Sequence, residues 1–272
     1  MSTVNQKKNQ LVNAVKKFPN VKAIGQTGSL EEDLIPGFSD IDMFVLCDRV
    51  PDAMERHNAY ETCKELYTEC NMNVCENCIW GTGDILIVDG IDTMFMFFTI
   101  GEMTTYVEEV LAGKHIYAEG EFYPIGRLAT IESIDILYEE DGVMSKLKEK
   151  VAVYPEELAE VTIHSHLSWA INEEDIGRAY LRKDVLFYHQ VLEKGIDHFL
   201  QALYAVNRTY FPSRKRSEQY IKNFKKVPKN CYERLLQVIE NGARSETILQ
   251  SIAEYRKLCE ELCNIAEHEV EE

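Results

Sequence analysis

The stretch AIGQTGSLEEDLIPGFSDIDMFVLC, residues 23–47, decides the fold, because it holds two apolar runs of strand length separated by a polar loop. The first run ends at Gly28 and Ser29, and the second begins, after ten intervening residues, with Asp40 and Asp42. Successive side chains of a strand point to opposite faces, so the two aspartates share one face of the second strand.

Two carboxylates on neighbouring positions of one face repel each other and resist ionising together unless a cation lies between them. Mg²⁺ suits Asp40 and Asp42, because it prefers hard oxygen ligands and takes others from water and substrate phosphates. Gly28 would allow a bulky anion to approach the backbone, and Ser29 offers an amide and a hydroxyl to phosphate oxygens. The pattern therefore indicates a site for Mg²⁺ and a nucleoside triphosphate.

The order Gly28-Ser29, ten residues, Asp40-Ile41-Asp42 resembles the nucleotidyltransferase superfamily that includes DNA polymerase beta. A short transferase domain followed by a helical domain looks most like the bacterial antibiotic nucleotidyltransferases, which act on aminoglycosides and lincosamides, and related uncharacterised bacterial proteins. The resemblance implies that Gly28 and Ser29 hold the triphosphate. It implies that Asp40 and Asp42 hold two Mg²⁺ ions.

The superfamily pattern also implies a third carboxylate on a neighbouring strand. We predict Asp92 in GIDTMFMFFTI, as metal ligand or base, because it opens a strand and shares a face with Met94 and Met96. Asp89 is the alternative, although in VDGID it also suits an ordinary turn. Without a third carboxylate, nucleotide binding without transfer becomes the better interpretation.

The hydrophobic pattern divides the chain into two parts. Short β-rich runs alternate with helical segments up to about residue 126, and almost everything from about residue 128 onward has helical period. We therefore predict an α+β nucleotidyltransferase domain over 1–127, with a mixed sheet flanked by helices, followed by an all-α helical bundle over 128–272. Strands are expected at 21–28, 40–46, 84–90 and 91–100, and helices at 52–70, 101–114, 131–150, 156–173, 177–210, 213–226, 229–241 and 244–268.

Basic side chains in the second part are candidates for neutralising the triphosphate. Arg178 and Arg182 are four residues apart and would lie on one face of a helix. Lys215 follows Pro212 in a basic run. We predict these three as nucleotide-binding residues. The alternative is a solvated basic face for Lys215, and an ion pair with Asp184 for Arg182.

The net charge of the chain limits the partners that it can bind. The formal net charge is −17, from 46 acidic and 29 basic residues, and such a field repels polyanions and anionic lipid surfaces. It disfavours nucleic acid and membrane as partners and favours a small or cationic acceptor. No secretory signal or apolar run of membrane-spanning length is apparent, so we expect a cytoplasmic protein, either a monomer or a homodimer.

Cysteine spacing leaves one question open. Cys63, Cys70, Cys75 and Cys78 lie close together in the sequence, but only the last two form a C-x-x-C pair, whereas a four-thiolate zinc site needs two such pairs. Reduced, half-buried thiols are the better interpretation.

These observations predict a Mg²⁺-dependent nucleotidyltransferase that moves a nucleoside monophosphate to a hydroxyl of a small molecule, with an aminoglycoside or lincosamide antibiotic as candidate acceptor. Two alternatives remain. One is a nucleotide-binding interaction protein or toxin–antitoxin component with a degenerate site, and the other is a transferase that modifies a protein.

Overall fold

The computed structural model describes residues 4–27, 34–120 and 122–270. The chain forms two compact units, which we call the sheet unit (Met1–Glu109 and Thr130–Val153) and the helical unit (Val110–Ala129 and Tyr154–Glu272). The chain therefore leaves the sheet unit, returns to it and leaves again. This division differs from the single boundary expected between residues 127 and 128.

The sheet unit is built on a six-stranded mixed sheet in the order β3-β4-β5-β2-β1-β6. The central pair β2 and β5 is parallel, and every other neighbouring pair is antiparallel. The strands are β1 (Val21–Gln26), β2 (Asp40–Cys47), β3 (Cys70–Cys78), β4 (Gly81–Val88), β5 (Ile91–Thr99) and β6 (Asp135–Glu139).

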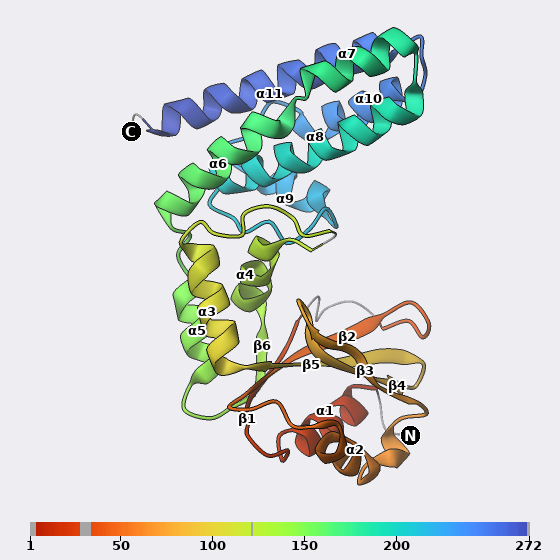
Figure 1. Ribbon diagram of the computed structural model, residues 1–272, viewed down its shortest axis with the longest axis vertical. Coiled ribbons are helices and arrows are strands. Elements are labelled where there is room, and N and C mark those ends of the chain that lie inside the picture. Colours follow the sequence, from red (N-terminus) through yellow and green to blue (C-terminus); the bar gives the residue numbers. More distant parts are fainter. Residues whose placement is uncertain (1–3, 28–33, 121, 271–272) are drawn as a thin grey trace. The chain divides into compact units, whose positions relative to one another are not determined.

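One face of the sheet carries the main core. Alternate side chains of the central strands, such as Ile41 and Met43 of β2 and Phe95 of β5, are buried there. Two helices cover this face, α1 (Val4–Val15) and α2 (Ala53–Glu61), followed by the short η1 (Lys64–Leu66) (Figure 1). Because alternate side chains of each strand are buried on this face, the side chains between them point to the opposite face.

The opposite face is partly covered by the returning segment. A Cβ placed on Gly25 of β1 would lie 2.5 Å from the Cδ1 of Ile134, so a larger residue here would require the Ile134 side chain to move. Met144 of α5 (Val143–Val151) packs beside the same glycine. Lys150 of α5 forms an ion pair with Glu108 of α3 (Ile100–Leu111), which ties the two helices together.

The expected fold class, an α+β part followed by a helical part, is confirmed, but several expected elements differ. The helix expected over 131–150 is wrong in its first half, where β6 pairs with β1. The helix α4 (Pro124–Ser133) and the edge strand β3 were not expected, and the helix at 52–70 is shorter. Strand β3 escaped notice because its residues CNMNVCENC lack the alternation that marks a half-buried strand.

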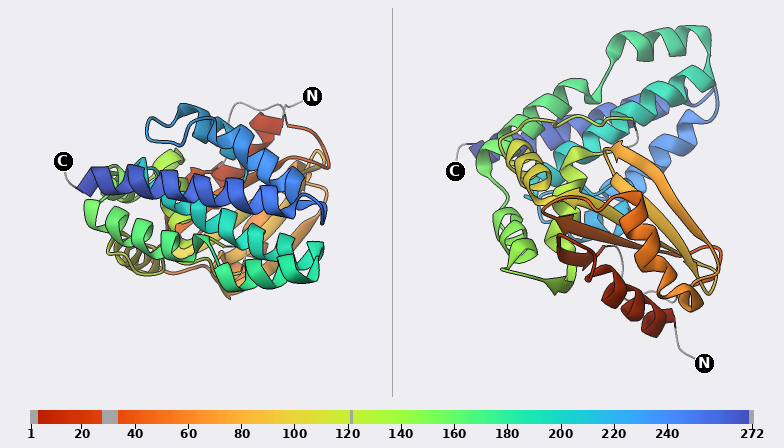
Figure 2. Two further views of the ribbon diagram at one scale, coloured as in Figure 1. Left: turned by 90° about the horizontal axis from the view of Figure 1, so that it is seen from above. Right: turned by 60° about the horizontal axis from the view of Figure 1, so that its bottom comes forward.

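In the helical unit, α6, α8 and α11 lie side by side (Figure 2). The long helix expected over 177–210 is two helices, because Lys183 takes a left-handed conformation with φ of 53° and the Asp184 side chain caps the next helix at the amide of Phe187. The helices are α6 (Glu156–Ala170), α7 (Glu173–Arg182), α8 (Val185–Val206), α9 (Ser217–Asn223), α10 (Cys231–Gly242) and α11 (Ile248–Val270).

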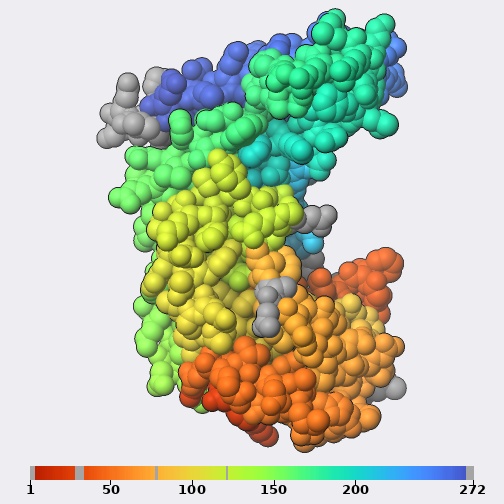
Figure 3. Space-filling view, viewed as in Figure 1, coloured from red at the N-terminus to blue at the C-terminus, as the bar shows by residue number. Residues whose placement is uncertain are grey.

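A close contact holds α6, α8 and α11 together. A Cβ on Gly195 of α8 would lie 2.6 Å from the carbonyl oxygen of Ala170, and that oxygen accepts a hydrogen bond from the Tyr255 hydroxyl at 2.9 Å. The side chains of α7 and α11 also abut (Figure 3), and Glu173 and Arg256 form an ion pair between them. Within the described residues, no helix combines the length and apolarity needed to cross a bilayer.

Candidate functional site

Three of the expected carboxylates gather at one edge of the sheet. Asp40 and Asp92 occupy paired positions in the parallel ladder of β2 and β5, and Asp42 is paired with Met94 one step further along. Paired positions of a sheet point to the same face. Since Ile41 lies in the core on the face covered by α1 and α2, the three aspartates point to the opposite face.

The face of the sheet that carries the three aspartates is exposed where β2 and β5 begin and is buried further along these two strands. Asp40 and Asp92 are exposed, and Asp42 is half-buried. Two positions beyond Asp42, Phe44 packs edge-on against Phe98 with ring centroids 5.1 Å apart, and both rings are buried. The acids therefore stand at the open end of an otherwise apolar surface, where water and a charged substrate can reach them.

The chain leaves β1 directly beside these acids. The amide of Thr27 donates to the carbonyl oxygen of Asp42 at 2.8 Å, which extends the β1–β2 ladder by one position. The next residues in the sequence, Gly28 and Ser29, lie outside the described residues, so their expected contact with phosphate remains a prediction. The last described residue before them, Thr27, lies next to Asp42.

Asp89, the alternative third carboxylate, is directed elsewhere. Its Oδ1 accepts from the Lys7 ammonium of α1 at 2.5 Å, and its φ of 52° is that of a turn residue. Because α1 covers the core face of the sheet, Asp89 is held toward that side. The geometry therefore favours Asp92 over Asp89 as the third member of the set.

The donor set fits a hard divalent cation, since all three side chains offer carboxylate oxygens. Across the residues that the structure describes, no three His, Cys, Asp or Glu side chains converge closely enough to hold a metal ion by themselves. A metal at this edge would therefore depend on one or two of the aspartates together with substrate oxygens. Of the four clustered cysteines, Cys63 and Cys70 are free thiols, and the side chain of Cys78 lies outside the described part. Cys75 is disulfide-bonded, so the expectation of reduced thiols is wrong for this residue.

The expected nucleotide-binding arginines lie on α7 of the helical unit. Arg178 is half-exposed and pairs within its own helix, donating to Asp175 at 2.9 Å and also to Glu174. Arg182 is exposed in the last turn. Among the described residues, Arg182 and Asp184 do not form the alternative ion pair. The Asp184 side chain instead caps α8 by accepting from the Phe187 amide.

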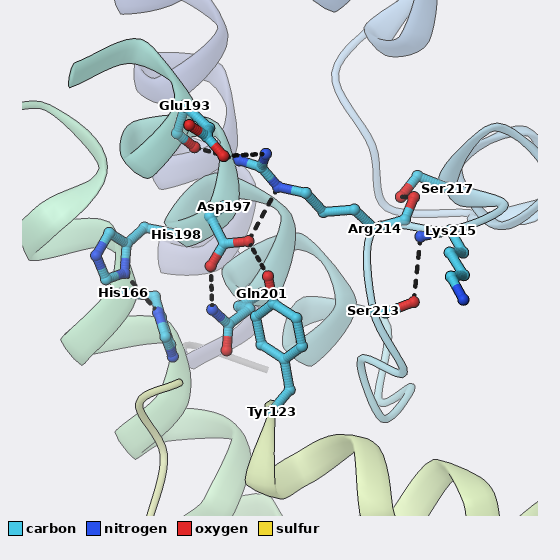
Figure 4. Close-up of polar contacts among 10 residues, drawn as sticks. All are labelled: Tyr123, His166, Glu193, Asp197, His198, Gln201, Ser213, Arg214, Lys215 and Ser217. Atoms are coloured by element: carbon cyan, nitrogen blue, oxygen red, sulfur yellow. Dashed lines mark hydrogen bonds and ion pairs between the residues drawn. The ribbon is translucent and has the colours of Figure 1, made fainter. Parts of the chain in front are cut away.

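Lys215 lies in the turn that precedes α9. Its backbone amide donates to the Ser213 hydroxyl at 3.2 Å, and its side chain is exposed and directed away from the neighbouring polar cluster (Figure 4). It is available to solvent. Its expected contact with a triphosphate stays a prediction.

That polar cluster is centred on Asp197 of α8 (Figure 4). The carboxylate accepts from the Tyr123 hydroxyl at 2.6 Å, from Arg214 Nε at 3.0 Å and from Gln201 Nε2 at 2.9 Å. Arg214 also donates to the backbone carbonyl of Glu193. Burial, followed by the hydrogen bond to Asp197, raises the pKa of Tyr123 well above its usual value, so Tyr123 stays a donor. Asp197 thus ties the segment before α4 and the turn before α9 to the middle of α8.

A histidine pair lies one residue further along α8. His166 is fully buried, and its Nδ1 lies 2.8 Å from Nδ1 of His198, while its Nε2 lies 3.1 Å from the carbonyl oxygen of Ile116. A carbonyl only accepts, so His166 carries its proton on Nε2 and its Nδ1 accepts from His198. Burial, reinforced by the neighbouring His198, lowers the pKa of His166 to about 4. His164, two residues before His166 on α6, is exposed.

Arg56 and Asp84 form a buried ion pair in the sheet unit. Arg56 Nε donates to Asp84 Oδ2 at 2.7 Å, and the same carboxylate accepts from the Tyr60 hydroxyl at 3.0 Å and the Asn73 amide at 3.0 Å. Arg56 also donates to the carbonyl oxygen of Pro51, and its guanidinium lies 5.3 Å from the ring centroid of Phe97. Every contact is internal to the core, which indicates a structural role.

Sequence reasoning missed Asp84, Asp197 and their partners. Apart from Gln201, which is four residues from Asp197, the partners lie 11 to 74 positions from their aspartate, and no local pattern connects them. One signal was available for Asp197. Glu193, Asp197 and Gln201 recur every four residues along α8, so they share one face of the helix.

Comparison with known proteins adds a family of unknown function. A family described as "Domain of unknown function (DUF4037)" matches residues 123–216, the stretch that runs from Tyr123 through the Asp197 cluster to Arg216. No curated protein matches the chain.

Two solved structures are similar in part. One is a nucleotidyltransferase-like protein from Exiguobacterium sibiricum 255-15, with 13% identity, a TM-score of 0.38 and coverage of 98% of this chain and 76% of that one. The other is the soluble domain of CorA from Methanocaldococcus jannaschii, with 13% identity, a TM-score of 0.16 and coverage of 91% and 96%. At these TM-scores neither structure bears on the chemistry of this chain.

Proposed function

We propose that the chain is a Mg²⁺-dependent nucleotidyltransferase, which moves a nucleoside monophosphate from a nucleoside triphosphate to a hydroxyl of a small molecule. The observation that carries the proposal is the paired position of Asp40 and Asp92 on parallel strands, with Asp42 on the same face. The chain also leaves β1 beside Asp42 and continues directly into Gly28 and Ser29.

The three carboxylates have distinct roles in this proposal. Asp40 and Asp42 hold the cation and orient the triphosphate at the open end of the face. Asp92 completes the set and would accept the proton of the attacking hydroxyl. Bound Mg²⁺ supplies charge neutralisation to the phosphates at this edge.

The reaction balances without any further reactant. The acceptor oxygen forms a bond to the α-phosphorus, and the bond from that phosphorus to the oxygen bridging to the β-phosphate breaks. Pyrophosphate leaves with the electron pair, and the hydroxyl proton passes to a carboxylate.

The remaining nucleotide contacts are proposals of the same kind. Gly28 and Ser29 would bind the triphosphate through backbone and hydroxyl groups. Arg182 and Lys215 are exposed cations that could reach an anion, whereas Arg178 would first have to exchange its pairs with Glu174 and Asp175.

The acceptor we propose is a cationic, hydroxyl-bearing small molecule of the aminoglycoside kind, with lincosamides as the second class to examine. The net charge of −17 supports this choice, because a negative field raises the local concentration of a cation and repels polyanions.

Calorimetric titration tests the nucleotide site without requiring the acceptor. The wild type is titrated with a non-hydrolysable nucleoside triphosphate, with and without Mg²⁺, beside the variant Asp40→Asn/Asp42→Asn. Asp48→Asn is the matched control, because it removes a carboxylate just past the other end of β2. We expect Mg²⁺-dependent binding in the wild type and in Asp48→Asn, and its loss in the double variant.

Three results would count against the proposal. Equal Mg²⁺-dependent affinity in the wild type and the double variant would show that these aspartates are solvated surface groups. Nucleotide binding without pyrophosphate release, across a screen of aminoglycosides, lincosamides and lysate proteins, would favour a nucleotide-binding interaction protein. Labelling of a lysate protein instead would identify a protein-modifying transferase.

A further inference from the structure

A tight turn precedes the first of the three carboxylates. In residues 35–39 the amides of Phe38 and Ser39 both donate to the carbonyl oxygen of Ile35, at 3.0 and 2.9 Å. The Ser39 hydroxyl accepts from the Ile35 amide at 2.9 Å, which closes the turn from the other side. These three hydrogen bonds fix the turn internally.

The turn is also fixed to the sheet. The amide of Gly37 donates to the carbonyl oxygen of Gly90 at 2.8 Å, and a Cβ on Gly90 would lie 3.1 Å from the Cβ of Pro36. Gly37 has φ of 78°, which a residue with a side chain adopts only with strain. Gly90 comes two residues before Asp92. The turn therefore lies at the edge of the sheet where β2 and β5 both begin.

Two large apolar side chains project from this turn into solvent. Phe38 is 90% exposed, the highest value among the exposed large hydrophobic residues, and Ile35 is 56% exposed. A single exposed apolar side chain is common on protein surfaces. Two of them on a hydrogen-bonded turn, next to three carboxylates, form an apolar surface beside a charged one.

The spacing between these surfaces suits a nucleotide. Phe38 is two residues before Asp40, which limits the separation of their Cα atoms to about 7 Å. A nucleotide has the same arrangement, because a ribose separates its flat apolar base from its charged phosphates. Aromatic side chains bind bases by stacking, which requires no hydrogen-bond code.

We propose that Phe38 is the stacking platform for the base of the nucleoside triphosphate, with Ile35 as its apolar flank. This inference rests on the proposed function, since the carboxylates are what hold the phosphates nearby. The ring of Phe38 would remain in water without a nucleotide and would be covered by the base when one binds. Because stacking is tolerant of base identity, the site should accept several bases and prefer purines, whose ring surface is larger.

The test separates the base from the phosphates by using two kinds of probe, one without a base and one with a base. Wild type and variants are titrated, in the presence of Mg²⁺, with inorganic tripolyphosphate and with non-hydrolysable analogues of ATP and CTP. We expect Phe38→Ala to weaken binding of the ATP analogue about tenfold while leaving the affinity for tripolyphosphate unchanged. Phe38→Trp should retain the affinity for the analogue. Phe38→Leu should behave as Phe38→Ala, because it keeps an apolar side chain without a ring.

Met54→Ala is the matched control, since Met54 is a 66% exposed apolar side chain of α2, on the other side of the sheet. Unchanged affinity of Phe38→Ala for the ATP analogue would overturn the inference and leave the proposed function intact. An equal loss for tripolyphosphate and the analogue would also overturn it, because the effect would then lie in the phosphate site.

Failure of the proposed function has a different signature. If the wild type binds neither probe in the presence of Mg²⁺, both proposals fall. If the analogue binds and depends on Phe38 but not on Mg²⁺ or on Asp40 and Asp42, the platform stands and the metal site does not.

Discussion

Asp40 and Asp92 stand side by side at the first positions shared by the parallel strands β2 and β5, although 52 residues separate them in the sequence. Parallel pairing brings the starts of both strands to one edge of the sheet. Two acids that open their strands therefore become neighbours. Asp42 joins them because it lies two residues further along the same face.

We expect Asp92→Asn to weaken Mg²⁺-dependent binding of a non-hydrolysable nucleoside triphosphate by at least about tenfold, or ~1.4 kcal/mol. The substitution keeps the shape of the side chain and removes the charge that attracts the cation. Calorimetric titration measures it directly. Asp89→Asn is the control, because asparagine also tolerates the φ of 52° at that position. A larger loss in Asp89→Asn than in Asp92→Asn would identify Asp89 as the third carboxylate.

The Arg56–Asp84 pair should contribute strongly to stability of the sheet unit. The side chains are 3% and 0% exposed, so Arg56→Met leaves a buried, uncompensated carboxylate. We expect the free energy of unfolding to fall by about 3–5 kcal/mol, measured by urea denaturation. Replacing both partners, as Arg56→Met/Asp84→Leu, should recover part of this loss because no buried charge remains.

Arg49→Met provides the comparison for this measurement. Arg49 pairs with Glu55 at 2.9 Å, but its side chain is 56% exposed, so water screens the pair. We expect a much smaller loss of stability than in Arg56→Met. Similar losses in Arg49→Met and Arg56→Met would refute the structural role assigned to the buried pair.

The buried histidine should make the helical unit less stable in mild acid. The pKa of His166 falls from 6.5 to about 4 on folding, so the unfolded chain binds a proton in this range while the folded chain does not. The stabilisation is therefore complete above pH 6.5 and is lost as the pH falls toward 4. Between pH 7 and pH 5 we expect this residue to account for about 2 kcal/mol.

Urea denaturation of wild type, His166→Gln and His164→Gln at both pH values tests this expectation. Glutamine retains a donor for the carbonyl oxygen of Ile116 and does not titrate. The loss of stability from pH 7 to pH 5 should be smaller in His166→Gln and unchanged in His164→Gln, whose histidine is an exposed residue of the same helix. An unchanged loss in His166→Gln would place the titration elsewhere.

Asp197 should hold the turn before α9 in place. In Asp197→Ala the guanidinium of Arg214 and the hydroxyl of Tyr123 lose their shared acceptor. Hydrogen bonds to a charged group contribute about 1.5–3 kcal/mol, so the turn should open at least about tenfold more often. Trypsin should then cleave after Arg214, Lys215 and Arg216 correspondingly faster.

Glu193→Ala is the control for this proteolysis experiment. Its carboxylate is 70% exposed and lies 3.4 Å from Arg214, while its backbone carbonyl, which the substitution keeps, still accepts from Arg214. We expect little change in its cleavage rate. Equal acceleration in both variants would mean that general surface charge, and not the Asp197 contact, controls the turn.

The helices and strands that sequence reasoning recovered are those with a strong local period. β1, β2, β4 and β5 were expected within a few residues of their observed bounds, as was α6. β6 was assigned to a helix because IESIDILYEEDG carries apolar residues at spacings compatible with both structures. Its pairing with β1 outweighs that local ambiguity.

The candidate site also has residues that the local sequence predicts and contacts that depend on tertiary packing. The sequence predicted Asp40, Asp42 and Asp92 as site residues because each lies at or near the start of an apolar strand. The contact of Asp89 with Lys7, which directs it away from Asp92, required the packing of α1. The clusters around Asp84 and Asp197 likewise depend on which distant elements pack together.

The sequence by itself determined the alternation of apolar and polar residues, and with it the face on which Asp40 and Asp42 lie, because side-chain direction in a strand depends only on position along it. Only the tertiary structure decided that β5 lies parallel to β2, that Asp92 stands beside Asp40, and that residues 130–153 return to the sheet unit. Strand order and register are set by the burial of whole faces against distant elements, and that free energy is not encoded in any short stretch of residues.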